Sequence, residues 1–174
     1  MCILIDTNCL SCVFEKRNSD HANFGPVFNW IFYGKGKIVY GGTTYKHELE
    51  AANRFLKILM EFHKVNKVVV IDKAAVDKKE NEIKAMVSHR NFDDPHIVAI
   101  IAVSGVKLVC TNEKRSIPFL TKTLFYTRGK KPKVYSSKSN ADLLCDSNVA
   151  ECCKPSSPLN KKTRNQLGFY KCNG

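Results

Sequence analysis

Short apolar runs alternate along the chain with longer segments in which apolar residues recur at helical spacing. The runs at 2–5, 38–40, 67–71 and 107–110 are typical of buried strands, and 133–135 is a fifth candidate. Between them, the periodicity predicts helices over about 20–33, 43–63, 72–87 and 97–103. This alternation predicts an α/β fold in which helices cover a mostly parallel sheet.

The longest predicted helix, 43–63, can be capped by Thr43 or Thr44 and is expected to bury one apolar stripe. That stripe consists of Leu49, Ala52, Leu56, Leu59 and Met60. Another helix start is marked by Pro95, because proline is favoured at the first helical position. Asp94 is therefore the expected N-cap of the helix that follows.

The chain divides by charge as well as by periodicity. Its 28 Lys and Arg against 16 Asp and Glu give a net charge of +12. Residues 1–113 carry 15 basic and 13 acidic side chains, whereas 114–174 carry 13 and 3. Because periodicity fades after about residue 136, we expect one domain over 1–136 and a basic, cysteine-containing C-terminal extension over 137–174. Such a balance favours an acidic partner, either nucleic acid or a membrane surface.

The composition excludes several classes of protein. With 44% hydrophobic and 25% charged residues, the chain is neither a long disordered segment, a collagen-like repeat nor a coiled coil. No apolar run approaches the ~18 residues of a membrane helix, and Asp6 ends the first run too early for a signal segment. We expect a cytoplasmic protein that makes no membrane contact. Cys2 and Cys110 lie inside apolar runs and are expected to be reduced core residues.

Several acidic residues are predicted to lie near the carboxyl ends of the strands, where parallel sheets bind their ligands. Asp6 directly follows the first predicted strand, and Glu113 lies just after the fourth. Asp94 precedes a helix, and Glu48 lies about one turn into another. Since ligands bind beyond the carboxyl ends of parallel strands, these acids can share one crevice. Each also has an ordinary explanation, for Asp94 as a helix cap and for Glu48 as a solvated helix residue.

Carboxylates that share a crevice raise one another's pKa, and a divalent cation relieves their repulsion. Hard cations such as Mg²⁺ prefer oxygen ligands. A cation held by carboxylates can activate water and stabilise the charge on a phosphodiester, while a basic surface holds the polyanion. An acidic crevice in a basic chain therefore favours a metal-dependent nuclease.

Four segments, taken in order, resemble the PIN-domain family. They are 3–8 (ILIDTN), 45–49 (YKHEL), 94–99 (DPHIVA) and 104–113 (SGVKLVCTNE). The resemblance covers about residues 2–115 and implies a three-layer α/β/α sandwich with a central, mostly parallel sheet. It also implies an acidic pocket for Mg²⁺ or Mn²⁺. Many members of the family are endoribonucleases, including the toxins of bacterial toxin–antitoxin pairs.

The resemblance implies a catalytic set of six residues. Asp6, Glu48, Asp94 and Glu113 would bind the metal ion, and Asn8 and Thr111 would be the polar residues beside them. Asp93 is a less favoured substitute for Asp94. The family pattern at the fourth position is Thr-x-Asp, whereas this chain has Thr111-Asn112-Glu113. That departure leaves open whether one or two metal ions bind.

We therefore expect a metal-dependent endoribonuclease that hydrolyses phosphodiester bonds in RNA, acting as a toxin or a defence effector. Two alternatives stay open: a catalytically weak or inactive PIN-like module that binds RNA or protein, and a structure-specific DNA nuclease. A nucleotide-binding Rossmann protein is disfavoured, because Asp6-Thr7-Asn8 stands where a glycine-rich loop is needed. The expected partners are RNA, an antitoxin or regulatory protein, and a second copy of the chain.

Basic residues after the last predicted acid are the expected contacts with RNA. They are Arg115, Arg128, Lys130, Lys131 and Lys133. The basic tail over 161–171 either binds RNA or is simply solvated. Two weaker signals are a zinc site and an RNA-contacting His96. The zinc ligands would be Cys145, Cys152, Cys153 and Cys172, although these lack a CxxC pair.

Overall fold

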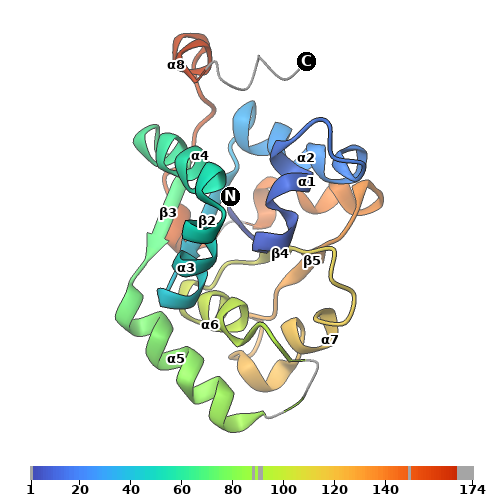
Figure 1. The fold of residues 1–174 in the computed structure, drawn as a ribbon, viewed down its shortest axis with the longest axis vertical. Coiled ribbons are helices and arrows are strands. Elements are labelled where there is room, and N and C mark those ends of the chain that lie inside the picture. Colours follow the sequence, from blue (N-terminus) through green and yellow to red (C-terminus); the bar gives the residue numbers. More distant parts are fainter. Residues whose placement is uncertain (1, 88, 90–91, 149, 168–174) are drawn as a thin grey trace.

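A five-stranded sheet forms the centre of the computed structural model, which describes residues 2–87, 89, 92–148 and 150–167 (Figure 1). The strands are β1 (Cys2–Ile5), β2 (Lys37–Gly41), β3 (Val68–Ile71), β4 (Leu108–Cys110) and β5 (Lys133–Tyr135). All neighbouring pairs are parallel, in the order β3-β2-β1-β4-β5. The parallel sheet expected from the sequence is confirmed. β1 and β4 are buried along their whole length, as strands covered on both faces must be.

Helices cover both faces of the sheet. They are α1 (Leu10–Phe14), α2 (His21–Phe32), α3 (Thr43–Ala51), α4 (Asn53–Lys64), α5 (Lys73–Met86), α6 (Pro95–Ser104) and α7 (Ile117–Leu120). Contacts among the rings of Phe14, Phe32 and Phe62 join α1, α2 and α4 in one layer. α5 and α6 pack together on the other face, because right-handed crossovers change face where the strand order reverses. The fold is the expected three-layer α/β/α sandwich.

The predicted helix over 43–63 is interrupted. α3 and α4 are separated by Ala52, whose φ of −98° and ψ of 51° are not helical. The buried residues of α4 are Phe55, Leu59 and Phe62. Met60, which the predicted stripe placed in the core, is 52% exposed. The stripe was wrong there because α4 starts in a new orientation after the break, and Phe62 packs against the ring of Phe14.

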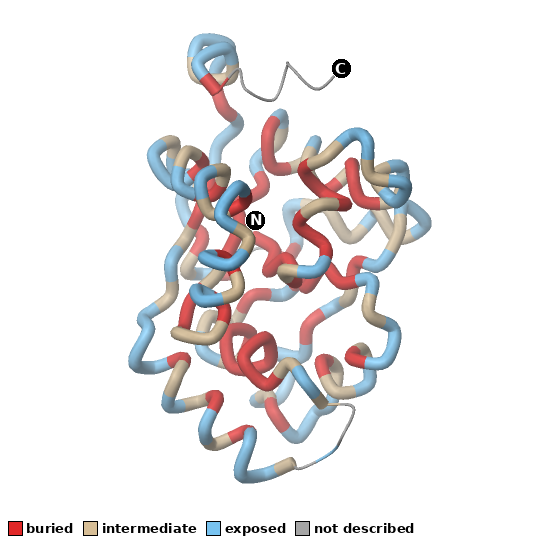
Figure 2. Tube along the Cα trace, in the orientation of Figure 1, coloured by how far each residue is buried: buried red, intermediate tan, exposed pale blue. Residues whose placement is uncertain are grey.

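The C-terminal extension packs back on the sheet domain. The 3-10 helices η3 (Lys138–Leu143), η4 (Asp146–Asn148) and η5 (Glu151–Cys153) follow β5, and α8 (Lys161–Gln166) comes last. A disulfide joins Cys153 to Cys2 at the start of β1. Figure 2 shows buried segments in the extension as well as in the sheet, and Ala150 and Leu159 belong to the main core.

Of the two cysteines that were expected to be reduced, one is a free thiol and the other is not. Cys110 is a buried free thiol, as expected, but Cys2 is not reduced, because the returning extension brings Cys153 to its sulfur. Within the described part of the chain, no helix has both the length and the apolar character that crossing a membrane requires.

Gly42 and Gly105 lie at helix ends and differ in both backbone conformation and packing. Both have positive φ, 79° and 66°, but ψ is 162° at Gly42, a region confined to glycine, and 20° at Gly105. A Cβ on Gly42 would lie 2.5 Å from Cγ1 of Val76 on α5, whereas a Cβ on Gly105 would meet nothing within 4 Å. We expect Gly105→Ala to lower the free energy of unfolding by about 1–2 kcal/mol and Gly42→Ala by about 2–4 kcal/mol, because overpacking adds to the backbone strain. Urea titration measures both, and equal losses would contradict the close packing of Gly42 on α5.

Candidate functional site

The strand order reverses between β1 and β4, and polar side chains meet at this point. Ligands of open α/β sheets bind at such a reversal, outside the carboxyl ends of the strands. Asp6 directly follows β1 and Thr111 directly follows β4. The backbone N–H of Asp6 donates to the carbonyl of Cys110 at 2.9 Å, which extends the pairing by one residue. Consequently the Thr111 hydroxyl reaches Oδ2 of Asp6 and donates to it at 2.8 Å.

Asp6 is a buried carboxylate, 3% exposed, with a hydrogen bond to each oxygen. Its Oδ1 accepts the backbone N–H of Asn8 at 3.1 Å, which starts the 3-10 turn η1 (Thr7–Cys9). Burial raises the pKa of Asp6, and the hydrogen bonds from Thr111 and Asn8 oppose that rise only in part. The Asn8 side chain is exposed and lines the adjacent cleft.

Glu48 reaches the same place from α3. Its Oε2 accepts the hydroxyl of Thr7 at 2.6 Å, and its Oε1 lies 3.4 Å from Nε2 of His96. Burial acts to raise the pKa of Glu48, but the nearby His96 and the hydrogen bond from Thr7 outweigh burial and leave the pKa lowered.

His96 presents a buried nitrogen toward the acids. Its side chain is 3% exposed, and Nε2 approaches Glu48 without the alignment of a hydrogen bond. Among the described residues, this nitrogen has no hydrogen-bond partner. Buried polar atoms are nearly always satisfied, so an unsatisfied one beside carboxylates points to an absent ligand or water.

Asp94 stands at the N-cap position of α6, as predicted, but its side chain makes no capping hydrogen bond. Burial raises its pKa to about 6, and repulsion from Asp6, Glu48 and Asp93 adds to this while His96 opposes it. The structure therefore places Asp6, Glu48, Asp94 and His96 in one electrostatic environment. It also removes the ordinary explanation of Asp94 as a capping side chain.

Glu113 lies in a cleft beside these acids but has a different partner. The cleft, of about 200 Å³, is lined by Asn8, Asp93, Asp94, Glu113, Arg115 and Ser116. Oε1 of Glu113 lies 3.0 Å from Nε of Arg115, and hydrogen bonds from that side chain and its backbone lower the pKa of Glu113. The backbone N–H of Glu113 donates to the hydroxyl of Thr111 at 3.0 Å, which ties the cleft to Asp6.

The donor set fits a hard divalent cation. Carboxylate oxygens are the preferred ligands of Mg²⁺ and Mn²⁺, and Mn²⁺ also accepts imidazole nitrogen. The acids do not form a tight cluster. Among the described residues, the group of three or more possible metal ligands whose ligating atoms all lie within 4.8 Å of one another consists of Cys2, Cys152 and Cys153. The acids repel one another, and a cation bound between them would offset that repulsion.

The predicted RNA contacts are divided between two ends of the sheet. Arg115 lines the acidic cleft. Lys133 pairs with Leu108 at the start of β4, so it lies at the end of these strands opposite Thr111. Arg128, Lys130 and Lys131 are exposed on the segment that leads to Lys133. None of these four cations lines the acidic cleft.

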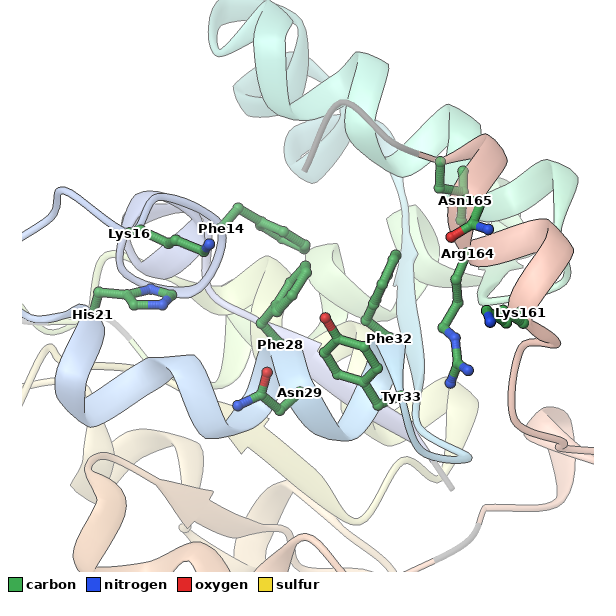
Figure 3. A pocket seen from close by; sticks show the side chains of 11 residues that line it. Phe14, Lys16, His21, Phe28, Asn29, Phe32, Tyr33, Lys161, Arg164 and Asn165 are labelled. Atoms are coloured by element: carbon green, nitrogen blue, oxygen red, sulfur yellow. The ribbon is translucent and has the colours of Figure 1, made fainter. Parts of the chain in front are cut away.

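Sequence reasoning missed a basic and aromatic surface next to α1. Lys16, Arg17 and Arg54 line a cleft of about 320 Å³ together with Glu15 and Asn18. Lys16 also lines a larger cavity of about 710 Å³ (Figure 3). Rings from α1 and α2 face basic side chains of α8 there, and the Arg164 guanidinium lies 5.6 Å from the centre of the Tyr33 ring. The spacing of the phenylalanines indicates only a buried helix face, so the sequence carried no sign of this cavity.

The expected zinc ligands do not meet as a group. Cys152 and Cys153 lie together with Cys2. Sγ of Cys145 instead lies 3.1 Å from Oγ of Ser147, and Cys172 lies outside the described residues. The predicted set of four cysteines was wrong in including Cys145 and omitting Cys2. The extension returns to β1 and so brings Cys152 and Cys153 to Cys2, and no local spacing in the sequence reveals this return.

Comparisons with protein-family models, with curated proteins and with solved structures find no match for this chain. The function of the protein must therefore be inferred from the geometry of its site. What the geometry defines is an α/β/α sandwich with three carboxylates and a buried histidine at the reversal point of a parallel sheet.

The raised pKa of Asp94 predicts how stability depends on pH. An unfolded chain ionises this group near its ordinary pKa of 3.8, so the ionised form opposes folding above pH 6, and the penalty fades as the pH falls toward 4. Asp94→Asn should raise the free energy of unfolding by about 1 kcal/mol near pH 8, allowing for solvent screening of this half-buried group, and by almost nothing near pH 4.

Urea titration at the two pH values measures this difference. Asp142→Asn is the control, because Asp142 is exposed and is not among the groups that shift the pKa of Asp94. A gain for Asp94→Asn that is the same at both pH values would contradict the raised pKa.

Proposed function

We propose that this protein is a metal-dependent endoribonuclease of the PIN type that cleaves single-stranded RNA. The observation that carries the proposal is the Asp94 carboxylate, which makes no capping bond and has its pKa raised first by burial and then by repulsion from Asp6 and Glu48. Such an arrangement costs stability and is therefore typical of functional sites.

Asp6, Glu48 and Asp94 are the residues that would hold Mg²⁺ or Mn²⁺, and Nε2 of His96 offers a further ligand for Mn²⁺. A divalent cation supplies charge that stabilises a phosphodiester under attack and lowers the pKa of water. Glu113 can join from the rim only if it releases Arg115.

The chain's own residues orient the acids and can move a proton. Hydrogen bonds from Thr111 and Asn8 keep the Asp6 carboxylate in one orientation, and Thr7 does the same for Glu48. A carboxylate oxygen of Asp94 that is not bound to the cation can accept a proton from the attacking water. Arg115 at the rim can bind a phosphate through the planar fork of its guanidinium.

Single-stranded RNA is the favoured substrate because the surface next to α1 combines rings with cations. Unstacked bases of single strands stack on aromatic side chains while Lys and Arg hold their phosphates. The cavity with Phe28, Tyr33 and Arg164 provides both kinds of group, and because it lies where α2 ends and β2 begins, away from the acids, it would hold RNA beyond the cleaved bond. An inactive RNA-binding module is the second candidate, because the Glu113–Arg115 pair keeps the fourth acid from the other three.

Asp6→Asn should reduce Mn²⁺-dependent cleavage of a single-stranded RNA by roughly 10²–10⁴-fold, since it removes charge from the buried centre of the site. Cleavage is followed by gel electrophoresis with RNA and with DNA of the same sequence. Glu50→Gln is the control, because Glu50 lies exposed on α3 in a pair with Lys46 and should leave the rate unchanged.

Three outcomes separate the candidates. Full activity in Asp6→Asn would contradict the nuclease site. RNA binding without cleavage by the wild type would favour the inactive module. Cleavage of branched DNA in preference to RNA would favour the structure-specific DNA nuclease.

Arg115→Ala should weaken RNA binding more than Arg128→Ala. Arg115 lies in the acidic cleft, whereas Arg128 lies on the segment that leads to the start of β5, at the other end of the sheet from the acids. We expect the slope of log affinity against log salt to fall by about 1 for Arg115→Ala, as for one lost phosphate contact. Fluorescence anisotropy in an Asp6→Asn background measures binding without cleavage. A larger loss of RNA affinity for Arg128→Ala would indicate that RNA binds at the other end of the sheet.

A further inference from the structure

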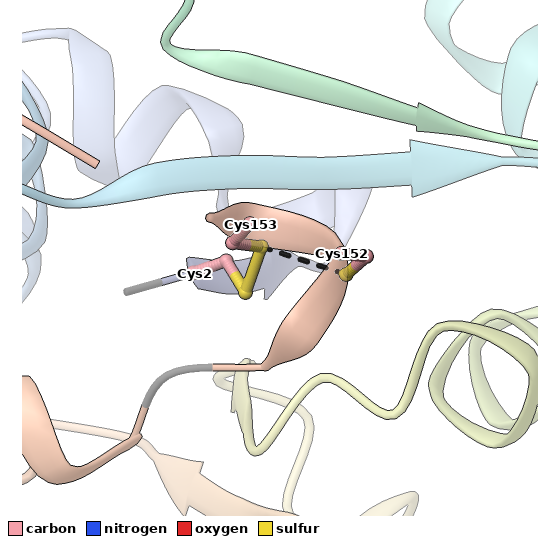
Figure 4. Close-up of side chains that lie close together, drawn as sticks. All are labelled: Cys2, Cys152 and Cys153. Carbon is pink, nitrogen blue, oxygen red and sulfur yellow. Dashed lines mark hydrogen bonds between the residues drawn. A yellow bond between two sulfur atoms is a disulfide. The ribbon is translucent and has the colours of Figure 1, made fainter. Parts of the chain in front are cut away.

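Three cysteine side chains meet at the amino end of the sheet, opposite the acids (Figure 4). Cys2 begins β1, whereas Cys152 and Cys153 lie in η5 at the far end of the chain. Their sulfur atoms all lie within 4.8 Å of one another. Sγ of Cys152 is 3.6 Å from Sγ of Cys153, which is bonded to Cys2. Nothing in the proposed nuclease site uses this group.

The spacing of the sulfurs is that of metal ligands. Two thiolates on one tetrahedral Zn²⁺ lie about 3.8 Å apart, given Zn–S bonds of about 2.3 Å. The Cys152–Cys153 distance already has this value to within a few tenths of an ångström. Binding of one cation by all three sulfurs requires that the Cys2–Cys153 bond open.

A buried ammonium group lies next to the sulfurs. Lys37 pairs with Cys2 in the register of β1 and β2, and its side chain is only 3% exposed. Its Nζ donates to Oδ1 of Asn66 at 3.0 Å, and within the described residues it has no carboxylate in an ion pair. Burial lowers the pKa of Lys37, while attraction to the Cys152 thiolate acts to raise it. Burial raises the pKa of the Cys152 thiol, and Lys37 acts in the opposite direction by favouring the thiolate.

A second buried lysine adds to this positive charge. Lys67 is 1% exposed and donates to the carbonyls of Gly34 at 2.7 Å and Gly36 at 3.2 Å. Burial and, to a smaller extent, repulsion from Lys37 lower its pKa to about 8. Two ammonium groups that repel each other at this end of the sheet call for a compensating anion.

We propose that Cys2, Cys152 and Cys153 of the reduced protein form a site for one thiophilic divalent cation such as Zn²⁺. Three thiolates and one divalent cation carry a net charge of −1, which the Lys37 ammonium balances. Three protein ligands leave the fourth position to water or to an external thiol. The bound cation would hold the extension to β1, as the disulfide does.

Disulfide and cation exclude each other at these sulfurs. Two molecules of a small thiol such as glutathione break the Cys2–Cys153 bond, leave both cysteines as thiols and combine with each other as a disulfide. Binding of the cation then displaces three thiol protons into solvent. A reducing cytoplasm favours the thiol form.

Titration of the reduced, full-length protein with Co²⁺ tests the proposal. A phosphine reductant keeps the thiols free, and excess Mg²⁺ competes at the acids. We expect thiolate-to-cobalt charge-transfer absorption that saturates at one equivalent and is displaced by Zn²⁺. Oxidation with diamide before the titration should abolish the absorption.

Two cysteine variants make the test specific. Cys152→Ser leaves the core pair of Cys2 and Cys153 intact and should weaken Zn²⁺ binding about 100-fold or more, because changes to outer partners alone cost about 10–100-fold. Cys145→Ser removes a cysteine outside the cluster and should bind Zn²⁺ as the wild type does. Equal affinities of the wild type and Cys152→Ser would overturn the proposal. Cobalt binding without thiolate absorption would also overturn it, and neither result would bear on RNA cleavage.

Discussion

Parallel pairing between β1 and β4 is the constraint on which both the fold and the candidate site depend. Leu4 pairs with Val109 and Ile5 with Cys110, so the next residues, Asp6 and Thr111, emerge side by side. A slip by one residue would turn every side chain of a strand to the opposite face. Because both strands are buried on both faces, apolar packing fixes this register, and the polar contact at its end follows.

Burial and charge act against each other at this contact. Burial raises the pKa of Asp6 and Asp94, while Thr111, the Asn8 amide and His96 oppose the rise. The remaining repulsion is a cost that the core must offset, and the continuous apolar strands beneath the site provide that stability. A bound divalent cation would turn this cost into binding energy, which is why we connect the strained acids with metal-dependent chemistry.

The sequence was informative where local pattern decides the outcome. Apolar runs located all five strands, and Pro95 located the start of α6 with Asp94 before it. It failed where residues distant in the chain decide. The orientation of α4 after the break at Ala52 goes with the packing of Phe62 on Phe14, and the partner of Cys2 follows from the path of the extension. The position of the acids was predictable from strand ends, whereas the contact of His96 with Glu48 needed the packing of α3 against α6.

The path of the C-terminal extension also determines how little of its positive charge lies near the acids. The extension returns to the amino end of β1, and Lys133 begins β5 at that same end, so much of the basic segment lies away from the acids. Arg115 does lie at the acids, but its guanidinium is paired with Glu113. Among the described residues, the cations therefore leave the repulsion between Asp6 and Asp94 largely unbalanced. A divalent cation, as proposed above, would balance it, and a phosphodiester bound there would meet Arg115 at the rim.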